Sequence, residues 1–219
     1  RFLRLGILIF GFLSVAIIVF TYFGQYAGNF VMAITPESSQ RGIILSDDKE
    51  FTAPTSRLSA DPVSDAWDIT YPWLNIEAAM NTDGNYRDPL HEYLAYTFYL
   101  QNTGNETVPV RMTLDIMSVH LNVDKAIRIL LIENDTIYRM YQKPDDVETE
   151  YDSLPEALYF VSDTRVLDEV IQNFRPGQIN KYTFLLWLEG EDPDCTNDVK
   201  GGRIKLQMNF KIEGGQDLT

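Results

Sequence analysis

The chain is poor in the residue types on which many catalytic and disulfide-stabilised proteins depend. It has one cysteine, Cys195, and two histidines in 219 residues. A single thiol cannot close an intramolecular disulfide, so no disulfide framework holds the protein together. Lys and Arg number 18 against 32 Asp and Glu, which gives a formal net charge of −14. Nucleic-acid binding depends on basic side chains that neutralise phosphates, so this balance excludes nucleic acid as a partner.

Complete catalytic motifs are also missing. The stretch HEYLA, residues 91–95, begins like the zinc-protease pattern H-E-x-x-H, but Ala95 stands where the second histidine ligand is needed. His120 follows an alternating strand pattern and is expected in a loop or core position. The carboxylates around Cys195 should raise the pKa of its thiol and make it unreactive. We therefore expect no enzymatic activity and no catalytic residue.

Charge is absent from a long N-terminal segment. Residues 5–36 contain no Asp, Glu, Lys or Arg, and Arg1 and Arg4 precede them. About 20 apolar residues span a bilayer, so residues 5–23 are expected to cross the membrane, with the N-terminus cytoplasmic and the remainder outside. A helix over residues 1–34 would exceed the ~30 Å hydrocarbon core, and Gly24 and Gly28 would let like helices approach closely. A cleaved signal peptide is the alternative, because Val31 and Ala33 satisfy the small-residue cleavage rule.

The rest of the chain has the two-residue period of β-strands. Residues 108–116 and 203–212 alternate apolar and polar side chains, while residues 92–102 and 181–189 are rich in aromatic and β-branched residues. Residues 126–143 are typical of a hairpin that turns at Asn134-Asp135. A helical repeat is suggested only around residues 164–173. These patterns predict a mainly β domain over residues 62–219, a two-sheet antiparallel sandwich of jelly-roll or immunoglobulin type.

Residues 35–61 are expected to be a linker or an edge strand that a second copy of the chain could accept. Their composition is rich in Ser, Pro, Asp and Thr, but residues 41–51 include a short apolar run. Such a strand can add to the edge of a neighbouring sheet. The predicted assembly residues are Gly24, Gly28, Ile43, Ile44, Leu45 and Phe51.

The stretch WLEGEDPDCTND, residues 187–198, is the most acidic loop between two predicted strands. Its Asp and Asn side chains supply closely spaced oxygens, which are the ligands that Ca²⁺ prefers. The spacing does not match the helix–loop–helix calcium pattern, so a solvated loop tip remains the alternative. The candidate calcium ligands are Asp192, Asp194, Asn197 and Asp198.

Three stretches, YTFYLQNTGN, KYTFLLWLEGEDPDC and GGRIKLQMNF, resemble exported Gram-positive surface proteins of the TasA and camelysin group, over about residues 92–212. The resemblance implies a jelly-roll-like sandwich and a biofilm-matrix fibre subunit, in which the N-terminal strand of one subunit completes the sheet of the next. Fibre subunits of that group lose their hydrophobic segment.

From these observations we expect a non-enzymatic cell-surface protein that self-assembles into a fibre or filament of the envelope or biofilm matrix. Two alternatives stay open. One is a single-pass, membrane-tethered accessory or binding domain of an envelope complex, with calcium as its cofactor. The other is a pilin-like subunit whose apolar helices form the core of a filament.

Overall fold

The structure, a computed structural model, describes residue 14 and residues 30–144 and 155–214. Apart from Ser14, the predicted transmembrane segment, residues 5–23, lies outside these residues, as do Gly24 and Gly28. Within them no helix combines the length and the hydropathy that a membrane crossing requires. The elements are β1 (Phe30–Ile34), α2 (Pro36–Gln40), β2 (Ile43–Ser46), β3 (Arg57–Ser59), η1 (Tyr71–Trp73), α3 (Ile76–Met80), β4 (Gly84–Tyr86), β5 (Leu94–Asn102), β6 (Val108–His120), η2 (Val123–Lys125), β7 (Ile127–Glu133), β8 (Ile137–Gln142), β9 (Leu158–Tyr159), β10 (Arg165–Phe174), β11 (Ile179–Leu188), η3 (Asn197–Val199) and β12 (Arg203–Ile212).

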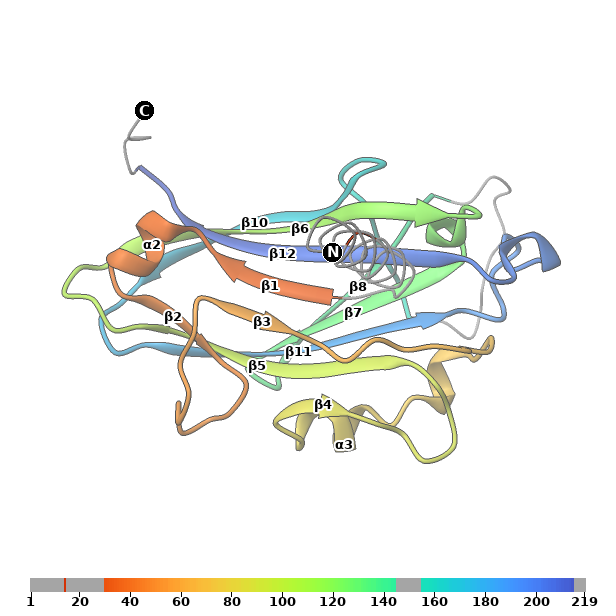
Figure 1. The fold of residues 1–219 in the computed structure, drawn as a ribbon, viewed down its shortest axis with the longest axis horizontal. Helices are drawn as coiled ribbons and strands as arrows, with labels where there is room; N and C mark the ends of the chain where they lie inside the picture. The colour runs from red at the N-terminus through yellow and green to blue at the C-terminus, as the bar shows by residue number, and fades with distance from the viewer. Residues whose placement is uncertain (1–13, 15–29, 145–154, 215–219) are drawn as a thin grey trace, which may run out of the picture.

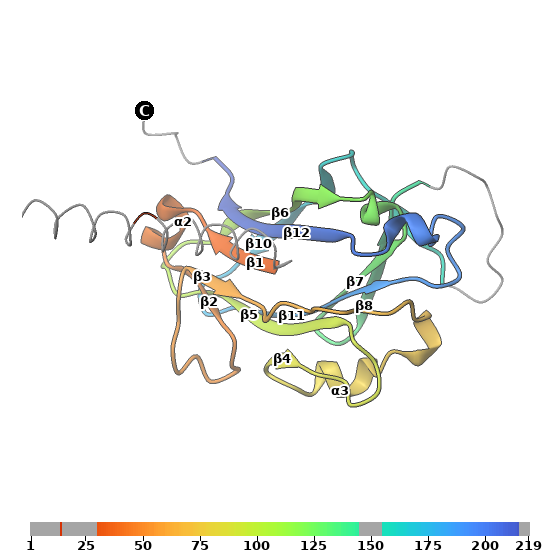
Figure 2. The same ribbon diagram turned by 45° about the vertical axis from the view of Figure 1, so that its right-hand side comes forward.

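These elements confirm a mainly β fold built from two sheets. The five-stranded sheet has the order β10-β6-β12-β1-β3, and the second sheet has the order β2-β5-β11-β7-β8-β9, with β4 also paired to β5. The two sheets lie face to face as separate layers (Figures 1 and 2). The sequence predicted antiparallel pairing throughout, and this is wrong for two pairs. Strand β1 runs parallel to β12, and β9 runs parallel to β8.

The main core fills the space between the two sheets. Alternate residues of β5 and β11 point into it, and they meet the inward side chains of β6, β12 and β1. Phe98 of β5 contacts Phe210 of β12 edge to face, with ring centroids 6.1 Å apart. Aromatic pairs in this geometry add to the free energy of burial.

A second apolar cluster covers the outer face of the seven-stranded sheet. The segment that carries η1 and α3 packs there against outward side chains of β5, β7 and β11, including Leu130, Leu185 and Trp187. Figure 2 shows α3 on this side of the sheet. The three strands are therefore buried on both faces, which explains their nearly continuous apolar sequences.

Two local predictions have opposite outcomes. The hairpin at Asn134-Asp135 is confirmed: both residues adopt positive φ angles, 50° and 58°, in the three-residue loop between the paired residues Glu133 and Ile137. The helix suggested around residues 164–173 is wrong, because these residues form β10. The register of β10 against β6 shifts twice, between Arg165 and Leu167 and between Ile171 and Phe174. These bulges interrupt the two-residue period, so the apolar spacing resembles that of a helix.

The predicted boundary between an N-terminal helix and a linker also needs correction. Residues 30–34 form strand β1, so a helix cannot continue to Ile34. Residues 35–61 contribute β2 and β3 to the two sheets, and Leu58 of β3 is buried in the main core. Thr35 caps α2, and Pro36 occupies its first position, where a missing N–H has no cost.

Candidate functional site

The first described strand, β1, lies inside the five-stranded sheet rather than at its margin. It pairs with β12 in parallel register, from Phe30 opposite Leu206 to Ile34 opposite Phe210. On its other side it pairs with β3, which forms the edge of the sheet. Figure 1 shows β1 beside β12. A strand in this position closes a gap that would otherwise leave backbone groups of β12 without partners.

Four of the five side chains of β1 are buried. Phe30 and Met32 have no exposed surface, and Val31 and Ile34 are each 6% exposed. The Phe30 ring stacks on Phe184 of the opposite sheet, with centroids 3.9 Å apart. Burial of such side chains contributes about 1.5–3 kcal/mol each. The strand therefore supplies a large part of the stability of its sheet.

A short connection joins β1 to the rest of the fold. The Thr35 N–H donates to the Phe210 carbonyl at 3.1 Å, and Ser38 Oγ in α2 accepts from the Ile212 N–H at 2.8 Å. Gly42, at φ 93°, then leads into β2 in the other sheet. A Cβ atom at Gly42 would lie 2.4 Å from the Gly104 nitrogen, so glycine is required there. The segment of α2 and Gly42 thus connects β1 in one sheet to β2 in the other.

The predicted donor segment, residues 41–51, is engaged within the chain. Its strand β2 pairs with the end of β5, from Ile43 opposite Asn102 to Ser46 opposite Tyr99. Ile43 and Leu45 are fully buried, Ile44 is half-buried, and Phe51 contacts the Tyr99 ring edge to face. Strand donation by residues 41–51 stays a prediction.

Sequence reasoning missed β1 because it joined residues 30–34 to the apolar run before them. One signal could have separated them. Ile34 is followed by Thr35-Pro36, a helix start in which Thr35 is the cap and Pro36 the first residue. A new helix that begins at Pro36 requires the chain before it to leave helical geometry.

The acidic loop after β11 turns two of its carboxylates inward. Glu189 is fully buried, and its Oε2 accepts from Trp187 Nε1 at 2.9 Å and from the Tyr71 N–H at 3.3 Å. Asp192 is also buried, where its Oδ2 accepts from Arg128 Nη1 and its Oδ1 accepts from the Asp194 N–H. These bonds tie the loop to the outer face of the seven-stranded sheet.

Arg128 is the largest fully buried side chain of the described residues. Its Nε and Nη2 are buried without a hydrogen-bond partner. Burial raises the pKa of the Asp192 carboxyl, and the Arg128 charge opposes that shift. A buried guanidinium needs a compensating charge, so Asp192 is required to hold Arg128 inside the protein.

This pairing bears on the predicted calcium site. Within residues 30–144 and 155–214 no group of three or more His, Cys, Asp or Glu side chains is placed to hold a metal ion. Asp192 points to Arg128, whereas Asn197 and Asp198 belong to η3. Calcium binding by Asp192, Asp194, Asn197 and Asp198 stays a prediction, and it would require Asp192 to leave Arg128.

The structure also places Cys195 and the two histidines, His91 and His120. Burial raises the pKa of the Cys195 thiol to about 11, with further contributions from Asp68, Asp192 and Glu189. This agrees with the unreactive thiol expected from the sequence, although burial is the main cause. His91 precedes β5, and its ring stacks on Trp73. His120 ends β6 and is exposed.

Comparisons with known proteins identify no family. No protein-family model matches the chain, and no curated protein matches it. Among solved structures, a β-glucosidase from Kluyveromyces marxianus in complex with glucose is similar over 76% of this chain at 11% identity, with a TM-score of 0.23. This chain spans 15% of that protein.

Proposed function

We propose that the protein is a non-enzymatic structural protein of the cell surface, which self-assembles by passing β1 from one copy to the next. The domain would then be a jelly-roll-like sandwich, as the resemblance to the TasA and camelysin group implies. The exported location rests on the charge-free residues 5–36 and the two arginines before them. No step of this proposal needs a cofactor or a catalytic residue.

The observation that carries the proposal is the position of β1. It is the first strand of the described domain, it fills an interior slot between β12 and β3, and it follows directly on the apolar N-terminal segment. A strand joined by a short connecting segment would make the same contacts with β12 and β3 of its own chain or of a neighbouring copy. When each copy fills the slot of the next, the contact is head-to-tail and produces a fibre.

The position of β1 at residues 30–34 limits where the N-terminal segment can be cleaved. Cleavage after Ala33, which satisfies the small-residue rule, would remove four of the five residues of β1. Strand exchange therefore requires an assembled chain that begins at or before Phe30. A chain that keeps residues 5–23 in the filament would favour the pilin-like alternative with apolar helices at the core.

A disulfide trap distinguishes exchange from a closed monomer. Ala33 and Asn209 are register partners on β1 and β12, and both are partly exposed. Ala33→Cys with Asn209→Cys, in a Cys195→Ser background, should give a ladder of covalent oligomers when surface material is oxidised. The control pair, Arg111→Cys with Lys211→Cys on β6 and β12, should cross-link only within one chain.

Electron microscopy and N-terminal sequencing of the same material complete the test. Filaments that give the ladder support strand exchange. Cross-linked monomers without a ladder, together with an intact chain in the detergent-soluble membrane fraction, would contradict it and leave the tethered accessory.

A further inference from the structure

The turn between β5 and β6 carries the triplet Asn105-Glu106-Thr107. This is the N-x-[ST] pattern, whose asparagine accepts a glycan in surface loops of exported proteins. A second triplet of this kind, Asn134-Asp135-Thr136, lies in the β7–β8 hairpin, and no other position of the chain fits the pattern. The structure distinguishes the two triplets by what each asparagine side chain contacts.

The β5–β6 turn holds Asn105 at its tip. The side chain of Asn102, a residue only 1% exposed, fixes the backbone on both sides of that tip. Its Oδ1 accepts from the Gly104 N–H at 2.9 Å, and its Nδ2 donates to the Glu106 carbonyl at 2.9 Å. Figure 1 shows this yellow-green turn at the left-hand end of the two sheets. The backbone is therefore held from inside, while the residue between the two anchored positions is exposed.

The carboxamide of Asn105 is available for modification. Within residues 30–144 and 155–214 it takes part in no hydrogen bond or ion pair. Thr107, whose hydroxyl completes the triplet, is exposed two positions further along the chain. A group attached to Asn105 Nδ2 would extend into solvent without displacing a contact of the fold.

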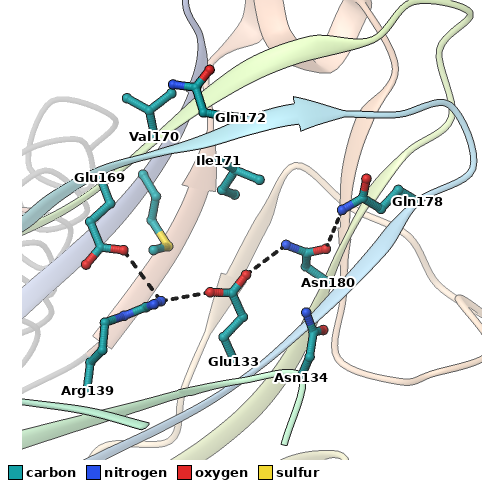
Figure 3. Close-up of a pocket in the computed structure, with 10 residues that line it drawn as sticks. Glu133, Asn134, Arg139, Glu169, Val170, Ile171, Gln172, Gln178 and Asn180 are labelled. Atoms are coloured by element: carbon teal, nitrogen blue, oxygen red, sulfur yellow. Dashed lines mark hydrogen bonds and ion pairs between the residues drawn. The ribbon is translucent and has the colours of Figure 1, made fainter. Parts of the chain in front are cut away.

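Asn134 is placed differently. Its Oδ1 accepts from the Lys181 N–H at 2.9 Å, and its own N–H donates to the Lys181 carbonyl at 2.9 Å. The residue has a φ of 50° and lines a polar cavity together with Glu133, Arg139 and Asn180. Figure 3 shows the Asn134 side chain pointing toward Asn180. A glycan on Asn134 Nδ2 would have to enter this cavity or break the bond to Lys181.

We propose that Asn105 is an N-glycosylation site and that Asn134 stays unmodified. The co-reactant is a glycan linked through phosphate to a membrane lipid, and a membrane transferase of the cell catalyses the transfer. A bond forms between Asn105 Nδ2 and the anomeric carbon as the bond from that carbon to the phosphate oxygen breaks. The lipid phosphate leaves with the electron pair of the broken bond and takes up the proton that Nδ2 loses. This inference rests on the exported location within the proposed function, because the triplet must reach the outer side of the membrane.

Peptide mapping of the full chain, taken from the surface fraction of its own cells, tests the proposal. Trypsin places the two triplets in separate peptides, residues 88–111 and 129–139. We expect the first peptide to carry an added sugar mass and to release sugar fragment ions, and the second to have its sequence mass. An unmodified first peptide, or a glycan on the second, would overturn the proposal.

Four variants made in the same cells identify the acceptor. Asn105→Gln removes the acceptor amide and Thr107→Ala removes the hydroxyl, so each should abolish the added mass. Thr107→Ser restores a hydroxyl and should keep the modification. Asn134→Gln, in the other triplet, is the matched control and should leave the first peptide modified. Added mass that persists in Asn105→Gln would place the sugar on another residue and contradict the proposal.

Protease digestion of intact cells separates this proposal from the proposed function. An unmodified chain that the protease removes is exported, so it overturns glycosylation alone. An unmodified chain that resists the protease contradicts the exported location as well. A modified chain that gives no disulfide ladder supports glycosylation and contradicts strand exchange.

Discussion

The ring of Phe30 stacks on the ring of Phe184 at a centroid distance of 3.9 Å, and this contact joins the first described strand to the opposite sheet. Both residues are fully buried. Strand β1 therefore joins three other strands: it pairs with β12 and β3 through its backbone, and its Phe30 ring contacts β11.

Replacement of Phe30 by alanine should therefore destabilise the domain strongly. Removal of a buried phenylalanine side chain costs about 3–5 kcal/mol, since the cavity left behind closes only in part. Urea denaturation followed by tryptophan fluorescence measures this change. Trp67→Ala is unsuitable as a control because it alters the probe, so Leu90→Ala, at a side chain 82% exposed, serves instead and should change stability by less than about 0.5 kcal/mol. Equal stability of the two variants would mean that β1 does not lie between β12 and β3.

The buried pair of Arg128 and Asp192 gives a second prediction. Asp192→Ala leaves the Arg128 guanidinium buried without its counter-charge, which costs about 3–5 kcal/mol. A double replacement, Arg128→Met with Asp192→Leu, removes both charges and should recover most of that loss. The comparison is made by urea denaturation of the single and double variants. A single variant as stable as the native chain would show that the pair does not hold the loop.

Much of the β architecture follows from sequence pattern. The two-residue alternation of β6 and β12 and the turn residues at Asn134-Asp135 depend on local chemistry, so their prediction succeeded. The failures at β10 and β1 have a shared cause, which is that tertiary pairing decided the local structure. Bulges in β10 produced apolar spacing typical of a helix, and the partners of β1 are 24 or more positions away in the chain.

The acidic loop shows the same limit at the level of a site. Close spacing of Asp192, Asp194, Asn197 and Asp198 indicated calcium, but the sequence could not reveal that Arg128, 64 positions away, turns Asp192 inward. The cavity around Arg139 (Figure 3) was missed for a similar reason. Its lining residues come from five strands, β6, β7, β8, β10 and β11, and from the loops at Asn134 and Gln178, so no single stretch of sequence indicates it.

The ion pair between Arg111 and Asp168, on the outer face of the five-stranded sheet, should make the free energy of unfolding depend on pH in the acid range. The Arg111 guanidinium donates to Asp168 at 2.6 Å and lowers the pKa of that carboxyl below its usual value, with a further contribution from Arg165. Because the folded pKa is below the unfolded one, the stabilising contribution is present above the unfolded pKa of about 3.9 and is lost as pH falls through the folded value. Asp168→Asn should flatten the stability profile below pH 4. The check is urea denaturation from pH 2.5 to 6, and an unchanged acid slope would contradict the prediction.

The thiol of Cys195 provides a probe of the loop in the native state. Burial raises its pKa to about 11, so at pH 8 only about one thiol in a thousand is ionised, against roughly one in four for an unfolded thiol of pKa about 8.5. Because the thiolate is the reactive form, the native chain should react with iodoacetamide at least about 100-fold more slowly than the chain in urea. Mass spectrometry of timed samples measures both rates. Asp192→Ala, which frees the loop from Arg128, should bring the native rate toward the unfolded one. Rapid alkylation of the native chain would show that the loop opens even with Asp192 in place. The contact between Arg128 and Asp192 would then not be what shields the Cys195 thiol.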